Sequence, residues 1–447
     1  MNTGTGSATP AESRLRDGTD GTAAGSHRLS RSQRKAIVAG TIGNTVEWVD
    51  WALYSIFAKI IADEFFPSGN GAVALLSTLA VFAVGFVMRP VGAAVLGAYA
   101  DRHGRKKGMT LTVALMAGAG FAIAITPSYA TIGVLSPLLL LLARLVQGFS
   151  AGGEFGSSSA FLVESAARGR RAFAGSWQQV SVAGGVLIAS VLGTLTTSVL
   201  SDDALHSWGW RAAFLFGGLL GLVGLWLRVS VEDTHSFTQA QDTGRTRTNP
   251  IKAMFVEHPA ATLRVVGITV AGTLTYYIWV NYLPTYANLT TGIPLRTALL
   301  SQTLCLIVFV VALPFAGLLS DRIGRKPTMA GFAGGFALLS WPLLHLLGDS
   351  FLSVFLVQLA GMVLLLGYSA NCAVIMAEQF PAEVRATGIA LPYALAVALF
   401  GGTAPYLTTW LHENGHSGLL WIYVSAASLL SLAVYLTMPE TKNKEFH

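Results

Sequence analysis

Four ionisable side chains lie deep inside apolar stretches of this 447-residue chain. Glu47 and Asp50 are three residues apart and share one helical face. Arg89 precedes Asp101 by 12 residues, which places it about 18 Å from that end of its helix, near the bilayer midplane. Arg144 occupies a similar stretch further along. Charged groups at such depth normally pair or face a water-filled cavity, so these residues predict ion pairs that switch partners and do not merely hold helices together.

The stretches that carry these residues are long enough to cross a membrane. Hydrophobic residues make up 53% of the chain, charged residues only 12%, and the mean hydropathy is +0.57. Soluble domains carry about 25% charged residues, and a membrane span needs about 20 apolar residues. We therefore predict an all-α membrane protein with twelve transmembrane helices, near residues 36–60, 72–98, 109–127, 136–158, 172–200, 211–230, 262–287, 297–319, 328–347, 351–378, 386–411 and 418–438.

The positive charges indicate the orientation of these helices. The net charge is +6, but the Lys and Arg residues are not distributed as a basic surface for nucleic acid would be. If the N-terminus is cytoplasmic, 24 of the 29 Lys and Arg residues fall in the tails and the even-numbered loops. An excess of Lys and Arg in cytoplasmic loops is typical of membrane proteins, so both termini are predicted to be cytoplasmic.

The apolar runs also predict the domain organisation. Residues 1–30 are rich in Gly, Ser, Thr and Ala and are expected to form a disordered cytoplasmic tail. A six-helix bundle is expected over 31–230, a polar cytoplasmic linker over 231–260, a second six-helix bundle over 261–438 and a cytoplasmic tail over 439–447. The first apolar run is too long for a cleavable signal peptide and lacks a small-residue cleavage site, so we interpret it as the first helix.

The two predicted halves repeat the same loop. The segment "GAYADRHGRKK" (97–107) recurs 220 positions later as "GLLSDRIGRKP" (317–327). A second pair, "VESAARGRRAFAG" and "AEQFPAEVRATG", has an offset of 214 positions. Parallel repeats related by an axis along the membrane normal suit alternating access, in which two halves rock about a central site.

This duplicated loop resembles the signature of the major facilitator superfamily, and the resemblance covers about residues 35–438. The segments "GNTVEWVDWALYS", "GFVMRPVG", "LLLLARLVQGFSAGGEFGSSSAFLVE" and "WGWRAAF" are similar to its metabolite:proton symporter branch, and most of all to the carriers of α-ketoglutarate there. The sequence departs from that branch at Val49 and Trp51, where Tyr or Phe is common, and in the helix that carries "LTYYIWVNYLPTY".

The resemblance implies a fold and an activity. The expected fold is two pseudo-symmetric bundles of six helices, and the expected activity is import of a small carboxylate, α-ketoglutarate or another dicarboxylate, by proton symport. It implies no enzymatic activity, no cofactor and no metal site. The expected location is a bacterial inner membrane, and the expected partners are a small organic acid, protons and lipid, with a monomer sufficient for function.

The residues suggest how the coupling works. In the empty site Arg144 pairs with Asp50, and a substrate carboxylate then displaces Asp50 because it matches the forked guanidinium better. Asp50 takes up a proton in exchange, and Glu47 is close enough to titrate with it as a pair. Arg89 is expected to bind a second carboxylate or to act in a gate. The other predicted substrate contacts are Tyr54, Gln147, Gln178, Tyr276, Tyr277, Asn281, Asn371 and Tyr393.

A further set of residues is predicted to close the cytoplasmic side. An acid at a helix end can hold an arginine or a helix N-terminus across the interface, and such contacts can form in one state and break in the other. The gating candidates are Asp101, Arg102, Arg105, Glu154, Glu164, Arg171, Asp321, Arg325, Glu378 and Arg385.

Several alternatives stay open at the level of sequence. They include uptake of another organic acid, uptake of an osmolyte such as proline or betaine, an efflux antiporter, and sodium in place of protons; the proton stoichiometry and the oligomeric state are open as well. A membrane enzyme would show clustered catalytic or metal-binding residues and a transport ATPase would show a P-loop, and the sequence has neither pattern. An anion channel fits the duplicated gating loops poorly.

Overall fold

The chain folds into helices throughout the part that the structure describes. The computed structural model describes residues 31–67, 69–103, 105–152, 154–164, 166, 169–229, 250–381 and 384–442, and contains no strand in those ranges. The predicted N-terminal tail, positions 231–249 of the predicted linker and the last five residues lie outside it.

The first half contains six long helical units. They are α1 (Arg31–Ile56) continued by α2 (Ala58–Phe65), α3 (Gly71–His103), α4 (Arg105–Ile125), α6 (Leu135–Ala151) continued by α7 (Glu154–Glu164), α8 (Arg171–Val199) and α10 (Trp210–Val229). The short elements α5 (Tyr129–Ile132), α9 (Asp202–Ala204) and η1 (Leu205–Gly209) lie in the connections.

The second half follows the short helix α12 (Pro250–Glu257) and has the same number of units. They are α13 (Pro259–Tyr276) continued by η2 (Tyr277–Tyr282) and α14 (Leu283–Thr291); α15 (Leu295–Ile323); α16 (Arg325–His345); α17 (Phe351–Ser369) continued by α18 (Cys372–Ala377); α19 (Arg385–Ala396) continued by η3 (Val397–Gly401) and α20 (Ala404–Glu413); and α21 (Leu420–Thr437), preceded by η4 (Ser417–Leu419). Each of the twelve predicted apolar runs coincides with one helical unit.

Local sequence signals set several helix boundaries. Pro259 opens α13, where the missing proline N–H costs no hydrogen bond. At the start of α17 the side chain of Ser350 accepts a hydrogen bond from the Ser353 N–H at 3.2 Å. Gly292 ends α14 with a φ of 76°, a left-handed conformation that glycine adopts without steric cost.

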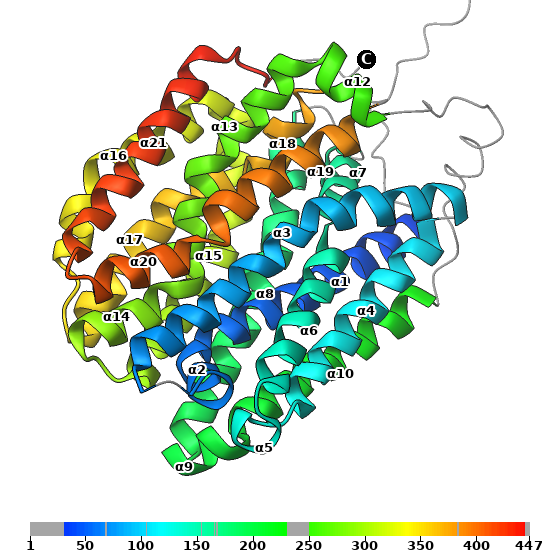
Figure 1. Ribbon diagram of the computed structural model, residues 1–447. Helices are drawn as coiled ribbons and strands as arrows, with labels where there is room; N and C mark the ends of the chain where they lie inside the picture. Colours follow the sequence, from blue (N-terminus) through cyan, green and yellow to red (C-terminus); the bar gives the residue numbers. More distant parts are fainter. Residues whose placement is uncertain are drawn as a thin grey trace, which may run out of the picture.

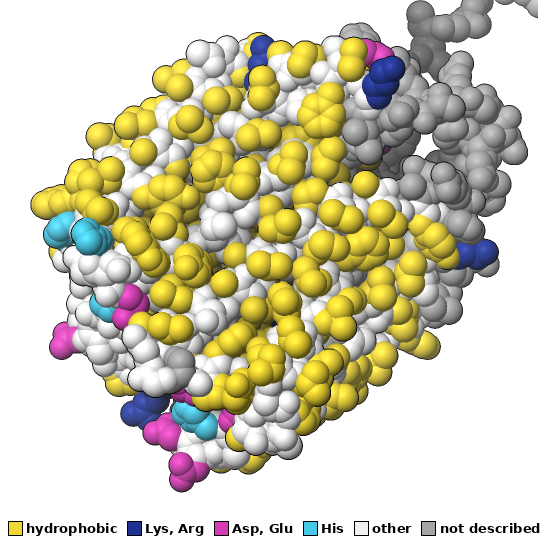
Figure 2. All heavy atoms as spheres, in the orientation of Figure 1, with side chains coloured by type: hydrophobic (Ala, Val, Ile, Leu, Met, Phe, Trp, Pro, Cys, Tyr) yellow, Lys and Arg dark blue, Asp and Glu magenta, His cyan; other side chains and the backbone are white. Residues whose placement is uncertain are grey.

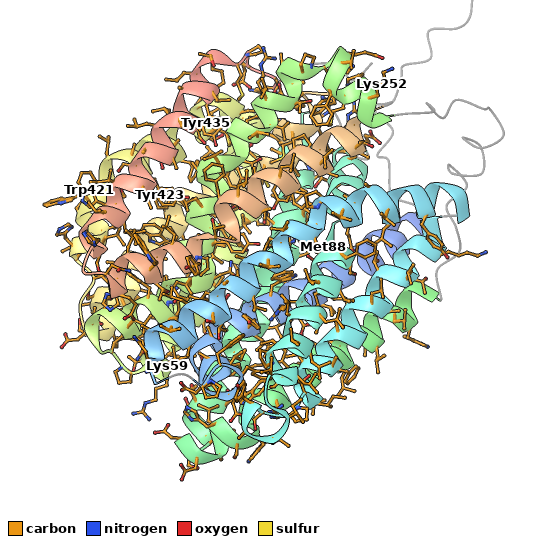
Figure 3. All side chains as sticks on the ribbon, in the orientation of Figure 1. Lys59, Met88, Lys252, Trp421, Tyr423 and Tyr435 are labelled. Atoms are coloured by element: carbon orange, nitrogen blue, oxygen red, sulfur yellow. The ribbon has the colours of Figure 1, made fainter. Side chains whose placement is uncertain are left out.

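The surface of the molecule is that of a membrane protein. Nine helical units in the described ranges are long and apolar enough to span a membrane, and Thr110–Ile125 of α4 is a shorter apolar helix. Figure 2 shows apolar side chains over the middle of the molecule and charged side chains near its two ends. Lys59 and Lys252 lie toward opposite ends in Figure 3. A broad apolar waist between charged ends fits a bilayer.

The two halves pack side by side, as Figure 1 shows. Helix α8 of the first half packs along α15 of the second, and α3 packs against α19 and α20. The unit formed by α13, η2 and α14 is the most enclosed, and every residue of η2 is buried. Both η2 and η3 are π-helical turns, as is η1 in a connection of the first half, and such turns are frequent at functional sites. The irregular backbone of the second half therefore lies where a site between the halves would need it.

Candidate functional site

Glu47 on α1 forms a buried ion pair with Arg89 on α3. The Arg89 Nη2 donates to the Glu47 Oε1 at 3.2 Å, and the two side chains are only 6% and 7% exposed. Removal of one partner from such a pair leaves an uncompensated buried charge, which costs about 3–5 kcal/mol. This pair therefore ties α1 to α3 in the present conformation.

Asp50 and Arg144 are connected through Gln147 and not directly. The Gln147 Nε2 donates to the Asp50 Oδ2 at 2.5 Å, and the Arg144 Nη1 donates to the Gln147 Oε1 at 2.7 Å. The structure thus differs from the direct pair that we expected, because Gln147 lies one turn after Arg144 on α6 and its amide reaches between the two charges. Within the described part of the chain, the Arg144 Nε and Nη2 and the Asp50 Oδ1 are buried and have no hydrogen-bond partner.

The carboxylate of Asp50 points into the first half. A Cβ added at Gly120 of α4 would lie 2.8 Å from its Oδ2, and one added at Gly217 of α10 would lie 3.0 Å from its Oδ1. A larger residue at either position would require the carboxylate to shift. The chain of Asp50, Gln147 and Arg144 is therefore enclosed by α1, α4, α6 and α10, and not in a chamber between the halves.

Aromatic rings cover both arginines. The guanidinium carbon of Arg89 lies 4.9 Å from the ring centroid of Trp51, and that of Arg144 lies 5.2 Å from the same centroid. Arg144 is also 3.8 Å from the ring centroid of Tyr54, whose hydroxyl donates to the Thr78 carbonyl at 2.9 Å. Desolvated cation–π contacts contribute about 2 kcal/mol each. Trp51 is one of the two positions near Glu47 where Tyr or Phe is common in the similar symporters, and its indole lies near both cationic groups.

Glycines bring α3 and α6 together along the segment that carries the arginines. A Cβ on Gly148 or Gly152 of α6 would lie 1.7 or 1.9 Å from a backbone carbonyl oxygen of α3, and the second of these carbonyls belongs to Arg89. A Cβ on Gly92 of α3 would lie 1.8 Å from a carbonyl oxygen of α6. Small residues permit such close helix contacts in membranes, and here they fix the relative positions of the two guanidinium groups.

A small cavity lies between the two halves, next to the Glu47–Arg89 pair. Its volume is about 10 Å³, which is about the space of one water molecule. The ring of Trp48 lies 5.7 Å from the Arg89 guanidinium carbon and 5.9 Å from the rings of Tyr276 and Tyr277, so it connects the ion pair to the cavity. We call this space the aromatic cavity; it is lined by Trp48, Gln179, Val182, Thr273, Tyr276, Tyr277, Tyr368 and Tyr393.

Sequence reasoning found part of this lining. Tyr276, Tyr277 and Tyr393 were predicted as substrate contacts and do line the aromatic cavity. The residues that it missed are Trp48, Gln179, Val182, Thr273 and Tyr368. Trp48 follows Glu47 directly, so the signal was an aromatic residue beside an intramembrane acid, but only the helix packing shows which face of α1 meets the second half.

Three other predicted contacts lie elsewhere. Gln178 and Asn281 are buried away from the cavity lining, and neither side-chain amide nitrogen has a hydrogen-bond partner among the described residues. Asn371 accepts a hydrogen bond from Ser320 at 2.5 Å and donates to the Gly367 carbonyl at 2.7 Å. Its amide therefore holds the break between α17 and α18 inside the second half.

Contacts between the halves close the side of the molecule where α7, α18 and α19 lie. The Asp321 carboxylate accepts hydrogen bonds from the N–H groups of Ala172 and Phe173, at 3.0 and 2.9 Å, at the start of α8. A carboxylate at a helix N-terminus stabilises by about 0.3–1 kcal/mol or more. The Arg385 Nη1 on α19 donates to Glu164 on α7 at 2.5 Å. These residues join the two halves, as a closed gate requires.

Arg325 connects the members of this gate that lie in the second half. Its guanidinium is 2.9 Å from Asp321 and 3.5 Å from Glu378. Burial raises the pKa of Glu378, and Arg325 partly offsets this by lowering that pKa. The Thr441 hydroxyl donates to Glu378, and the Glu440 carboxylate accepts from the Arg325 N–H at 2.9 Å. The segment after α21 is thus part of the same network.

The remaining gating candidates are less fully described. The side chains of Asp101, Arg102 and Arg105 lie outside the part that the structure describes. Glu154 opens α7 and Arg171 opens α8, and both are partly buried. Their roles stay a prediction.

The opposite ends of the two halves also touch. Thr285 of α14 donates to the Ser55 carbonyl of α1 at 3.3 Å. The hydroxyls of Ser190 and Thr194 on α8 lie 2.8 and 3.2 Å from that of Thr303 on α15. The aromatic cavity therefore has contacts between the halves on both of its sides.

The sequence matches the profile of the family described as Major Facilitator Superfamily over residues 40–391 and 300–447. It is 38% identical to the alpha-ketoglutarate permease of Escherichia coli K12, over 90% of this chain and 93% of that protein. It is 37% identical to the citrate-proton symporter of Klebsiella pneumoniae, over 89% of this chain and 90% of that protein.

A third relative and a solved structure extend the comparison. The chain is 33% identical to the glycine betaine/proline/ectoine/pipecolic acid transporter OusA of Dickeya dadantii, over 92% of this chain and 84% of that protein. Its fold is similar to that of the partially occluded inward-open xylose transporter XylE from E. coli, with a TM-score of 0.71, 18% identity and coverage of 92% of this chain and 99% of that one.

Proposed function

The chain belongs to the major facilitator superfamily, and we propose that it imports a small metabolite that carries a carboxylate, together with protons, by alternating access. The chain is a multi-pass membrane transporter, because its relatives and structural neighbours are transporters and not enzymes. The proposal adds the direction, the coupling ion and the shared chemical group of the substrate, and places both termini in the cytoplasm of a bacterium.

The names of the relatives support the choice of substrate group. One relative is named for α-ketoglutarate, one for citrate with protons, and one for glycine betaine, proline, ectoine and pipecolic acid. These compounds differ in net charge and in shape, but each has at least one carboxylate. A carboxylate is also the group that a forked guanidinium binds best.

The observation that carries the proposal is the state of Arg144. This side chain is fully buried, its Nε and Nη2 lack hydrogen-bond partners in the described part of the chain, and its hydrogen bond to Gln147 connects it to Asp50. A structural ion pair would use these donors directly. Because a neutral amide separates Asp50 from the Arg144 guanidinium, Asp50 can bind and release a proton while the helices stay packed.

The coupling that we propose runs from the aromatic cavity to Asp50 through packed groups. Substrate in the cavity contacts Trp48 and shifts the Glu47–Arg89 pair. The close contact of α3 and α6 passes that shift to Arg144 and Gln147, and Asp50 binds or releases its proton. The contacts of Asp321 and Arg385 then break on one side while those of Thr285 and Ser190 hold on the other.

The test is the substitution Asp50→Asn in the full chain in proteoliposomes. Asparagine keeps the size of the side chain and cannot ionise, so exchange of substrate across the membrane should persist while accumulation driven by an imposed pH gradient is lost. Asp63→Asn is the matched control, because Asp63 is an exposed acid on α2, and it should accumulate substrate like the parent. Proton-driven accumulation by Asp50→Asn would refute the coupling role.

A further inference from the structure

The aromatic cavity has an unusual lining for a site that takes dicarboxylates. Five of its eight lining residues are aromatic, and they come from both halves. None of the described residues that line it carries a charge at neutral pH. The hydroxyl oxygens of Tyr276 and Tyr277 are buried and have no hydrogen-bond partner in the described ranges.

The charges nearest to the cavity cancel one another. Arg89 is paired with Glu47 at 3.2 Å, and the rings of Trp48 and Phe86 lie between its guanidinium and the tyrosines of the cavity. The Asp50–Gln147–Arg144 chain is enclosed in the first half. A dianion moved into such surroundings loses its hydration and finds no excess positive charge in return, and such burial is costly. The lining therefore favours a substrate whose own charges sum to zero.

The rings provide a place for a positive group without a carboxylate partner. Indole and phenol faces attract cations by their quadrupoles, and alkylated ammonium groups are recognised by clusters of such rings. The rings of Trp48, Tyr276 and Tyr277 lie 5.9–6.3 Å from one another, centroid to centroid. The hydroxyls of Tyr276 and Tyr277 can donate to a carboxylate at the other end of the same molecule.

Glycines hold the tyrosines of the second half in this arrangement. A Cβ on Gly272 would lie 2.2 Å from ring atoms of Tyr368, and one on Gly401 would lie 2.7 Å from a ring atom of Tyr277. The backbone of α13 and η3 therefore leaves room for two rings of the cavity. These glycines therefore allow the rings of Tyr368 and Tyr277 to pack directly against the backbone that borders the cavity.

We propose that the aromatic cavity selects a zwitterion with an alkylated ammonium group and a carboxylate over a dicarboxylate. This inference rests on the proposed function, since it names the class of carboxylate that the transporter takes. The closed cavity widens when either gate opens, and the ammonium group lies against the rings of Trp48, Tyr276 and Tyr277 while the carboxylate accepts hydrogen bonds from the tyrosine hydroxyls.

A matched pair of probes tests the charge requirement. Glycine betaine and 3,3-dimethylbutanoate have the same shape and the same carboxylate, and differ only in a positive nitrogen in place of a neutral carbon. Their binding to the purified full chain is measured by isothermal titration, with α-ketoglutarate as the dicarboxylate. We expect betaine to bind at least about tenfold more tightly than either of the other two. Equal binding of the matched pair, or tighter binding of α-ketoglutarate, would overturn the proposal.

Substitutions then assign the preference to the rings. Trp48→Phe and Tyr277→Phe keep an aromatic face and should keep most of the betaine preference, whereas Trp48→Leu and Tyr277→Leu should remove it. Tyr435→Phe is the control, since Tyr435 is a buried tyrosine on α21 whose hydroxyl donates to the Ile268 carbonyl away from the cavity; the residue is labelled in Figure 3. A preference that survives both leucine variants in folded protein would contradict the role of the rings.

Transport by the same protein separates this proposal from the proposed function. If a pH gradient drives accumulation of α-ketoglutarate but not of betaine, proton symport of a carboxylate stands and the selectivity proposed for the cavity is wrong. If a pH gradient drives accumulation of none of the three probes, the proposed function is wrong, and the binding preference measured without a gradient still decides whether the cavity selects a zwitterion.

Discussion

At the scale of single residues, Arg144 is the side chain with the most unusual surroundings. It lies over the ring of Tyr54, donates one hydrogen bond to Gln147 and keeps two further donors without a partner among the described residues. An isolated charge at this depth costs about 2.5–3.5 kcal/mol on insertion scales. The aromatic face and the nearby Asp50 offset that cost only in part, so loss of the Asp50 charge on protonation should be felt at Arg144.

Replacement of Arg144 by lysine should fail although the charge is kept. A lysine ammonium lacks the planar fork and cannot lie flat over the ring of Tyr54 while it donates to Gln147. We expect proton-driven uptake by Arg144→Lys to fall about 10- to 100-fold, the range of one lost charge-assisted hydrogen bond. Labelled uptake in proteoliposomes measures this, and Arg296→Lys, an exposed arginine at the start of α15, should leave uptake unchanged. Parent-like uptake by Arg144→Lys would remove the guanidinium from the mechanism.

At the scale of elements, the contact between α3 and α6 decides where both arginines lie. Glycine is a poor helix former by about 1 kcal/mol relative to alanine, yet Gly148 and Gly152 occupy this contact because any larger residue would overlap the backbone of α3. The helices therefore gain close packing in exchange for intrinsic helix propensity.

Gly152→Ala should disturb this contact. Its Cβ would lie 1.9 Å from the Arg89 carbonyl oxygen, so the helices must separate, and overpacking of this kind costs about 1–3 kcal/mol. We expect a lower melting temperature and a larger loss of uptake than of expression. Gly184→Ala is the matched control, because nothing lies within 4 Å of its added Cβ, and that variant should be at least as stable as the parent. Equal stability of the two variants would contradict the proposed contact.

The gate elements predict a dependence on pH. Because burial in the closed gate raises the pKa of Glu378, the closed state binds a proton there more readily than an open, hydrated gate. This contribution to closure is present below the ordinary carboxyl pKa of about 4.3 and is lost as the pH rises through the raised value. The gate should therefore open more often as the pH on that side rises.

Alkylation of a cysteine placed in the gate measures this opening. Ala172→Cys introduces a thiol at a fully buried position beside Asp321. The labelling of the parent, which contains the buried Cys305 and Cys372, is subtracted as background. The remaining labelling rate should rise with pH more steeply than that of a free thiol. Adding Glu378→Gln should remove the excess. The same excess in the glutamine variant would assign the pH dependence to another group.

At the scale of the whole molecule, the two halves hold each other on both sides of a small cavity. Asp321 and Arg385 act on one side, and Thr285, Ser190 and Thr303 act on the other. A substrate larger than one water molecule cannot enter the cavity unless one set of contacts breaks. Alternating access requires that the two sets break in turn.

A disulfide across the outer contact should stop transport. The side-chain oxygens of Ser190 and Thr303 are 2.8 Å apart, so cysteine sulfurs at the two positions can approach each other closely enough to form a disulfide. We expect oxidised Ser190→Cys/Thr303→Cys to lose uptake and to recover it after reduction, while each single variant stays active. Full uptake by the oxidised double variant, with the bond verified by mass spectrometry, would show that α8 and α15 need not separate there.

The sequence alone determined the class of fold and the identity of the charged residues inside the membrane. Twelve apolar runs, the duplicated loops at 97–107 and 317–327, and intramembrane Glu47, Asp50 and Arg144 are local patterns, because hydropathy and charge placement follow from the bilayer as solvent. These patterns suffice to predict helices and to identify the charged residues whose burial in the membrane needs a physical explanation.

Only the tertiary structure decided which of those residues meet. Gln147 lies between Asp50 and Arg144, and Gln179, not Gln178, lines the cavity beside Trp48. A rotation of one residue in a helix turns a side chain by about 100°, and the rotation of each helix is set by packing against several neighbours at once. The sequence lists the charged and aromatic groups, whereas the separation of a charged core in the first half from an aromatic cavity between the halves exists only once the helices are packed.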